Sequence, residues 1–149
     1  MKKLFLAAIA LTMTLGASAR NNTTITFNNL PVVSQNFITS NFGTATIKKI
    51  KAGTAKYEVE FTNGTELEFY KNGSLKQAEA ERQALPVSVL NSLPANVKTY
   101  VSSKFANWKL TDVEVKSSGK IEVELEKGKY DAELTFNQAG KLLKSEIDD

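Results

Sequence analysis

The chain of 149 residues contains no cysteine and no histidine. The absence of cysteine excludes disulfide bonds, thiol nucleophiles and lipid attachment through sulfur. The absence of histidine removes the commonest general base, and both absences remove the ligands on which most zinc and copper sites depend. A Ser-His-acid triad is therefore impossible. We expect neither a cofactor nor a metal site.

Carboxylate pairs and Ser–Lys dyads remain chemically possible, but the sequence favours neither. Ser102, Ser103 and Lys104 are adjacent in an expected helix, where neighbouring positions do not face each other. Outward glutamates on strands should share similar environments, whereas a glycosidase needs two carboxyls with different pKa values. The motifs of a calcium loop and of a glycine-rich phosphate loop are absent. We therefore expect that the protein is not an enzyme.

Residues 1–19 have the features of a secretory signal peptide. Lys2 and Lys3 precede a mostly apolar run, and Ala17-Ser18-Ala19 forms a signal-peptidase site. The run is shorter than the roughly 20 apolar residues that cross a bilayer. We predict cleavage after Ala19, a periplasmic or secreted protein, and no stable membrane insertion afterwards.

Removal of this segment changes the charge balance of the chain. Without Lys2 and Lys3, 17 of the 19 basic residues remain against 16 acidic residues. A basic stripe with interleaved aromatic residues is also absent from the sequence. Nucleic acid is therefore not expected as a partner.

The most prominent pattern is an internal repeat. A Leu-Pro pair followed by a helical pattern occurs at residues 30–31 and again at residues 93–94. The segment Tyr-Glu-Val-Glu-Phe-Thr-Asn-Gly at residues 57–64 returns as Ile-Glu-Val-Glu-Leu-Glu-Lys-Gly at residues 121–128. A duplicated structural unit explains this pattern. We predict two repeats, residues 20–82 and 83–149.

Each repeat has the pattern of a helix followed by strands. Proline suits the first helical turn, because its missing N–H has no helical partner there. Alternation of apolar residues with glutamates then predicts antiparallel strands with one face on the core and one in water. Asn63-Gly64 predicts a type I′ hairpin turn with positive φ at both residues. The predicted fold class is α+β, with two tandem helix-then-antiparallel-strands repeats, helices packed on one face of the sheet, and the other face exposed. We expect the two sheets to join edge to edge, which protects open edges.

The chain resembles the PepSY-like, β-lactamase-inhibitor-protein-like domains. The resemblance is carried by the Leu-Pro helices, the Tyr-Glu-Val-Glu-Phe strand, the Asn-Gly turn and the Glu-Leu-Glu-Phe strand. The resemblance extends over residues 30–78 and 93–146. It implies an exported bacterial module, often duplicated, whose helices pack on one side of an antiparallel sheet. It also implies that the other side of the sheet can meet a partner protein.

We therefore predict a monomeric binding module that docks a protein or peptide through its exposed sheet face, with inhibition or modulation of a hydrolase as a specific form of that role. The outward acidic side chains would attract a basic partner, and outward Tyr70 and the single tryptophan, Trp108, belong to residue types enriched at interfaces. The candidate partner-binding residues are Glu58, Glu60, Glu66, Glu68, Tyr70, Trp108, Glu122, Glu124, Asp131 and Glu133.

Alternatives remain open for these residues. The glutamates could form a solvated sheet face by pairing with Lys48, Lys56, Lys120 and Lys129 across strands. Trp108 could cap the core, because its ring buries a large apolar area. The alternative function is a calcium- or small-ligand-binding structural envelope protein that uses the outward carboxylates as oxygen ligands.

Overall fold

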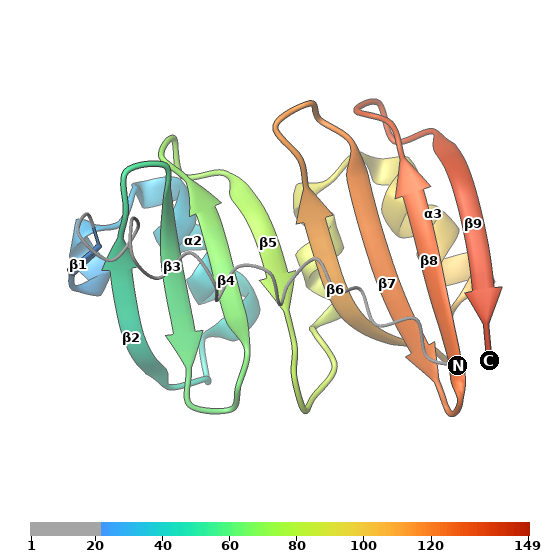
Figure 1. Cartoon of the computed structure of the whole chain (residues 1–149), viewed down its shortest axis with the longest axis horizontal. Helices are drawn as coiled ribbons and strands as arrows, with labels where there is room; N and C mark the ends of the chain where they lie inside the picture. The colour runs from blue at the N-terminus through green and yellow to red at the C-terminus, as the bar shows by residue number, and fades with distance from the viewer. Residues whose placement is uncertain (1–21) are drawn as a thin grey trace.

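The structure is a computed structural model that describes residues 22–149, so the predicted signal peptide and its cleavage site lie outside the described residues. One antiparallel sheet of 9 strands contains the strands in their sequence order (Figure 1). The strands are β1 (Thr23–Thr24), β2 (Ile47–Ala52), β3 (Lys56–Phe61), β4 (Glu66–Tyr70), β5 (Leu75–Glu79), β6 (Lys109–Val115), β7 (Ile121–Lys127), β8 (Tyr130–Phe136) and β9 (Leu142–Asp148). The predicted α+β class with an antiparallel sheet is confirmed.

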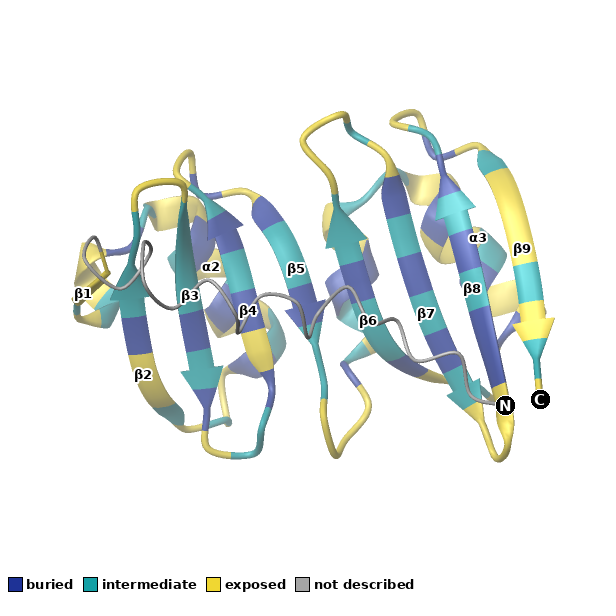
Figure 2. Cartoon of the chain, viewed as in Figure 1, coloured by how far each residue is buried: buried dark blue, intermediate teal, exposed yellow. Residues whose placement is uncertain are grey.

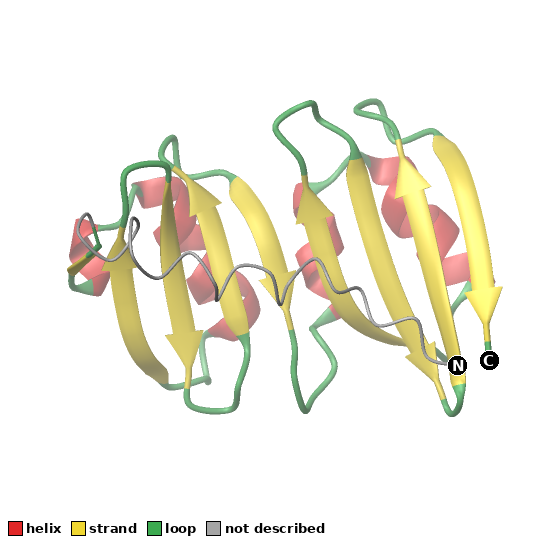
Figure 3. Cartoon of the chain, viewed as in Figure 1, coloured by secondary structure: helices red, strands yellow, loops and turns green. Residues whose placement is uncertain are grey.

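The helices are α2 (Val32–Phe42) and α3 (Ala95–Lys104), with the 3₁₀ segments η2 (Phe27–Asn29) and η3 (Val87–Ser92). Pro31 and Pro94 occupy the N-cap positions of α2 and α3. Figure 3 shows the helices behind the sheet. Phe37 of α2 contacts Phe69 of β4 edge to face, with ring centroids 5.6 Å apart. Tyr100 of α3 makes the same contact with Phe136 of β8 at 5.9 Å.

The inward face of the sheet forms the core, as the alternation of apolar residues predicts. Along β4 and β7, buried residues alternate with half-buried or exposed ones (Figure 2). One buried row crosses six strands through directly opposed residues: Val59, Leu67, Ala78, Val113, Val123 and Leu134. The helices and this row belong to one buried cluster. The opposite face therefore carries the polar side chains.

The hairpin turn at Asn63-Gly64 differs from the predicted type I′ turn. Gly64 has a φ of 91°, but no residue other than glycine has a positive φ in residues 22–149. The Gly64 amide donates to the carbonyl of Phe61, and the Asn63 side chain accepts from the amide of Thr65. This three-residue loop needs left-handed backbone only at its last residue, so asparagine supplies a side-chain acceptor instead.

The expected edge-to-edge joining of the two halves occurs between β5 and β6. Ala78 lies opposite Val113 there, and Glu79 lies opposite Asp112. The hydroxyl of Tyr70 on β4 donates to the carbonyl of Val115 on β6, which ties the strands on both sides of β5 together. On the helical side, η3 contacts both α2 and α3. The seam is therefore supported on both faces of the sheet.

In the part of the chain that the structure describes, no helix is long and apolar enough to cross a membrane.

Candidate docking face

A line of carboxylates crosses the outward face of the sheet at right angles to the strands. Every strand from β3 to β9 contributes one member, and each member lies directly opposite its neighbour in the register of the sheet. We call this line the carboxylate row. Its members are Glu60, Glu66, Glu79, Asp112, Glu124, Glu133 and Glu146.

The spacing of the carboxylate row follows from sheet geometry. Neighbouring strands lie about 4.8 Å apart, and like charges in directly opposed positions destabilise a sheet. Hydrophobic burial on the inward face offsets this cost, because the same strands carry the buried row of Val59 to Leu134. The row therefore concentrates negative charge along one line of the surface.

Two shorter lines of polar residues run beside the carboxylate row. One contains Glu58, Glu68, Gln77, Glu114 and Glu122. The other contains Glu126, Asp131 and Asp148. Of the 16 acidic residues of the chain, only Glu81 and Asp149 lie outside these strands. Nearly all of the negative charge of the protein thus belongs to one face.

Lysines neutralise the flanks of this face. Lys56 pairs with Glu58 at 3.1 Å and also with Glu68. The remaining pairs of face acids are Lys51–Glu60 at 3.4 Å, Lys76–Glu68 at 3.6 Å, Lys116–Glu122 at 3.5 Å and Lys144–Glu146 at 3.1 Å. The most exposed of these pairs, Lys144–Glu146, contributes roughly 0–1 kcal/mol, whereas Lys56–Glu68 is partly buried.

The middle of the carboxylate row is different. Glu66, Glu79, Asp112 and Glu124 form no ion pair with any described lysine. The carboxylate of Asp112 accepts two hydrogen bonds of 3.2 Å from the Gln77 side-chain amide. Cross-strand pairing with lysine, the alternative of a solvated face, thus occurs for Lys56. It provides no lysine partner for these four acids. Lys129 pairs with Asp149, and Lys48 and Lys120 pair with no acid in residues 22–149.

Burial and mutual repulsion change the protonation of these carboxyls. Burial raises the pKa of Asp112 to about 8, the Gln77 hydrogen bonds oppose this shift, and the charges of Glu79, Glu124 and Glu114 add to it. Burial also raises the pKa of Glu124 to about 7, with further contributions from its acidic neighbours, Glu133 first. The pKa values of Glu66 and Glu79 rise for the same reasons, burial first. The outward carboxyls therefore do not share the similar environments that the sequence predicted.

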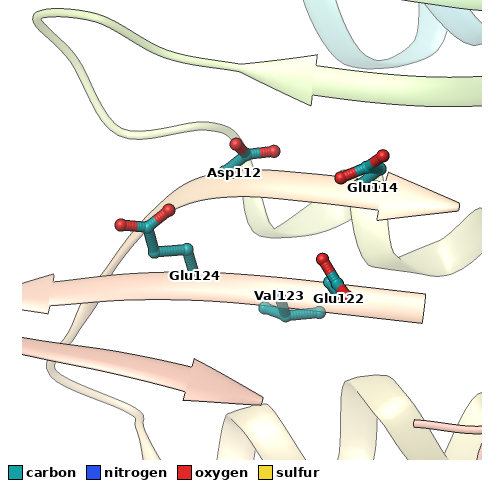
Figure 4. A pocket seen from close by; sticks show the side chains of 5 residues that line it. All are labelled: Asp112, Glu114, Glu122, Val123 and Glu124. Atoms are coloured by element: carbon teal, nitrogen blue, oxygen red, sulfur yellow. The ribbon is translucent and has the colours of Figure 1, made fainter. Parts of the chain in front are cut away.

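A small hollow opens beside the seam. Asp112, Glu114, Glu122 and Glu124 line it, and their carboxylates come from β6 and β7 (Figure 4). Val123 completes the lining, and Lys116 pairs with Glu122 beside the hollow. The four acidic side chains favour a cationic group over an anionic one.

The structure brings most of the predicted site residues together on this face. Glu58, Glu60, Glu66, Glu68, Tyr70, Glu122, Glu124 and Glu133 all share it. Asp131 belongs to the same face but is only 6% exposed, so it is less accessible than the sequence suggested. Trp108 lies apart, between α3 and β6, where its ring meets that of Phe105 edge to face at 5.2 Å. Whether these residues contact a partner stays a prediction.

Sequence reasoning missed Glu79, Asp112 and Glu114, whereas it did predict that Glu126 faces outward. Asp112 was missed because the register shifts between Leu110 and Asp112, so strict alternation does not predict its outward direction. This register shift is a β-bulge. The available signal for it was the spacing of two apolar residues, Leu110 and Val113, which lie three positions apart and are both buried.

Comparison with known proteins identifies the family. The family model described as "Putative beta-lactamase-inhibitor-like, PepSY-like" matches the chain twice, over residues 18–77 and 55–144. The chain therefore belongs to the PepSY-like family, and the resemblance seen in the sequence is confirmed. A search of curated proteins found no match.

Solved structures from the genus Bacteroides share the fold. A "putative periplasmic protein" from Bacteroides vulgatus is 30% identical, with 88% of this chain and 99% of that chain covered and a TM-score of 0.72. A "putative calcium-regulated periplasmic protein" from Bacteroides thetaiotaomicron is 27% identical, with the same coverage and a TM-score of 0.71. A second Bacteroides vulgatus protein, 24% identical over 86% of this chain and 99% of its own, has a TM-score of 0.65. The similar structures are thus described as periplasmic proteins.

Proposed function

We propose that this protein is an exported, non-enzymatic binding module that docks a basic protein or peptide segment on the carboxylate row. The observation that carries the proposal is the unneutralised middle of the row, Glu66 to Glu124, on a face whose flanking acids have lysine partners. A cationic segment would supply the missing counter-charges, and its approach would lower the raised pKa values of the row. Electrostatic complementarity of this kind sets both partner choice and association rate.

The carboxyls suit binding better than catalysis. An acid–base pair needs one carboxyl with a raised pKa and one that stays ionised. Asp112 and Glu124 are instead both raised, with burial as the first cause in each case. The sequence supplies no histidine or cysteine to complete another mechanism.

We also propose that the binding face is built by two tandem repeats, each with its helix on the inner side of the sheet. The edge-to-face contact of Phe37 with Phe69 recurs as that of Tyr100 with Phe136. Two overlapping matches to one family model agree with this arrangement. Duplication would double the length of the outward face and so provide an extended site for a linear segment.

Binding of a labelled deca-lysine peptide, followed by fluorescence anisotropy, tests the docking proposal. The probe should bind saturably to protein purified from the periplasm of an expression host. Reversal of two row charges, Glu79→Lys with Glu124→Lys, should weaken binding at least ~10-fold. The matched control, Glu81→Lys with Asp149→Lys, makes the same change in net charge outside the strands and should alter affinity less than ~2-fold.

Equal weakening by both pairs would show that net charge alone attracts the probe, and it would refute docking on the row. Circular dichroism of each variant checks that the fold is retained. The finer proposal, inhibition of a hydrolase, is supported by the family description. Adding the protein to a serine β-lactamase assay tests it, and unchanged turnover at saturating protein would reject that enzyme as the target.

Calcium binding is the second candidate function, because the Bacteroides thetaiotaomicron neighbour is described as calcium-regulated. In residues 22–149, no group of three or more acidic side chains is arranged to hold a metal ion. Calcium would therefore have to draw separate carboxylates together. A ligand that binds only the folded state raises the melting temperature, so an unchanged melting temperature at millimolar calcium would reject this candidate.

A further inference from the structure

The last strand, β9 (Leu142–Asp148), forms an open edge of the sheet. Among residues 22–149 it pairs with β8 on one side and has no strand on the other (Figure 1). The opposite edge of the sheet is β1, which has only two residues. An unpaired edge of seven residues presents backbone donors and acceptors in the order that another strand requires.

Two large apolar side chains are exposed along β9. Leu143 and Ile147 are each 55% exposed. Ile147 lies opposite Ala132 and Ser145 opposite Leu134, so both belong to the helical side of the sheet. Leu143 is the extra residue of a bulge and precedes Ser145 by two positions. The apolar residues therefore flank Ser145 symmetrically.

Charged side chains flank Ser145 on the outward face in the same symmetric way. Lys144 lies opposite Thr135 and Glu146 opposite Glu133, which places both on the outward face. Within one chain they form an ion pair of 3.1 Å, with side chains 63% and 39% exposed. The order from 143 to 147 is thus apolar, basic, small, acidic, apolar.

This order is self-complementary in an antiparallel pair centred on Ser145. In that register Ser145 faces Ser145 of a second copy, and Lys144 faces Glu146 of the second copy. Leu143 then lies opposite Ile147 of the second copy. The two-fold axis generates each contact twice, giving two opposite-charge pairs and two apolar pairs, both of which stabilise directly opposed strands.

We propose that β9 is a homodimerisation edge, where two copies pair antiparallel about Ser145 and continue the sheet from one subunit into the other. The expectation of a monomer, made from the sequence, took no account of this edge. Such a seam buries less surface than the roughly 1,200–2,000 Å² of a stable complex. The dimer is therefore a weak one, and the rise of its population with concentration is part of the proposal.

A single cysteine tests the register directly, because the chain has no cysteine of its own. Directly opposed antiparallel residues have Cα atoms about 4.5–5.5 Å apart, within the range that a disulfide spans. Ser145→Cys should therefore form a covalent dimer under mild oxidation. Ser103→Cys, on the exposed surface of α3, is the matched control and should stay monomeric.

Charge exchange tests the same register without a covalent bond. Sedimentation velocity between ~10 µM and ~1 mM should show association of the unaltered protein. Lys144→Glu alone and Glu146→Lys alone each oppose like charges and should abolish association. A mixture of the two single variants, or one chain that carries both changes, restores opposite charges and should associate again.

Three results would overturn the proposal: no association of the unaltered protein at ~1 mM, equal cross-linking of the two cysteine variants, or no rescue in the mixture. Circular dichroism on each single variant ensures that loss of association is not loss of folding. The results for Ser145→Cys and Lys144→Glu are independent of the docking proposal, because neither residue belongs to the carboxylate row.

Discussion

Glu79 of β5 lies directly opposite Asp112 of β6, so two acidic side chains meet at the seam that joins the two halves of the sheet. The residue before Glu79 in β5, Ala78, lies opposite Val113, and both are fully buried. The seam thus has two opposed carboxyls on its outward face and apolar contact on its inward face. The carboxylate row passes through this point, and for that reason the properties of the seam and of the docking face are linked.

The raised pKa of Asp112 predicts that stability falls as pH rises. The folded state holds the Asp112 proton up to about pH 8, whereas the ordinary value is 3.8. Between these values the folded state binds more protons than the unfolded chain, so the free energy of unfolding should decrease from pH 5 to pH 9. Asp112→Asn should flatten this dependence and raise the melting temperature at pH 9 by a few degrees.

Urea denaturation at pH 5, 7 and 9 measures this effect. Asp149→Asn is the control, since Asp149 lies outside the strands and should leave the slope unchanged. The prediction is wrong if the free energy of unfolding of Asp112→Asn changes with pH as steeply as that of the unaltered protein. Ionisation of Asp112 would then not destabilise the folded state.

Tyr70 is expected to stabilise the seam from the outward face. Its hydroxyl donates to the Val115 carbonyl across β5, and the side chain is half-buried. Tyr70→Phe should lower the free energy of unfolding by about 0.5–1.5 kcal/mol, the usual net contribution of one hydrogen bond. Tyr130→Phe is the matched control, because Tyr130 is exposed and makes no hydrogen bond that contributes to the seam. Equal effects of the two changes in chemical denaturation would contradict this role.

Gly73 should tolerate a side chain far less well than Gly128. Both have positive φ, 94° and 59°. A Cβ on Gly73 would lie 2.8 Å from Cβ of Pro31, whereas one on Gly128 would meet nothing within 4 Å. Gly128→Ala should cost only the backbone strain, about 1 kcal/mol, and Gly73→Ala should cost about 1–3 kcal/mol more through overpacking against the start of α2. Thermal unfolding of both variants measures the difference, and similar melting temperatures would show that the Pro31 contact relaxes freely.

Much of this fold follows from patterns that the sequence displays. Period-two alternation predicts β3 and β7, and proline predicts the starts of α2 and α3, because both signals depend on local sterics and burial. The glutamates of β3, β4, β7 and β8 were predicted to face outward for the same reason.

The carboxylate row, in contrast, depends on strand register. Bulges at Leu110/Asp112 and Glu68/Phe69 shift which residues oppose each other. A one-residue error reverses the faces of a strand, so the opposition of Glu79 to Asp112 could not be read from either segment alone. The self-complementary order of residues 143–147 could not be recognised from the sequence either. It matters only because β9 is an edge strand, and the position of a strand in the sheet depends on the whole fold.

The two halves should unfold together, since η3 joins them. Leu90 of η3 is fully buried in the cluster that contains residues of both halves, and Ser88 of η3 donates to the Asn41 side chain of α2 at 2.7 Å. Leu90→Ala should therefore cost about 2–5 kcal/mol and shift the unfolding of both halves equally. Fluorescence of Trp108 reports on the second half alone, whereas amide hydrogen exchange of β3 and β4 reports on the first. Coincident shifts by both probes are expected for one cooperative unit. A variant in which Trp108 unfolds while β3 and β4 keep their protection would instead mean that each half folds by itself, and that the seam between Glu79 and Asp112 is only a contact between independent domains.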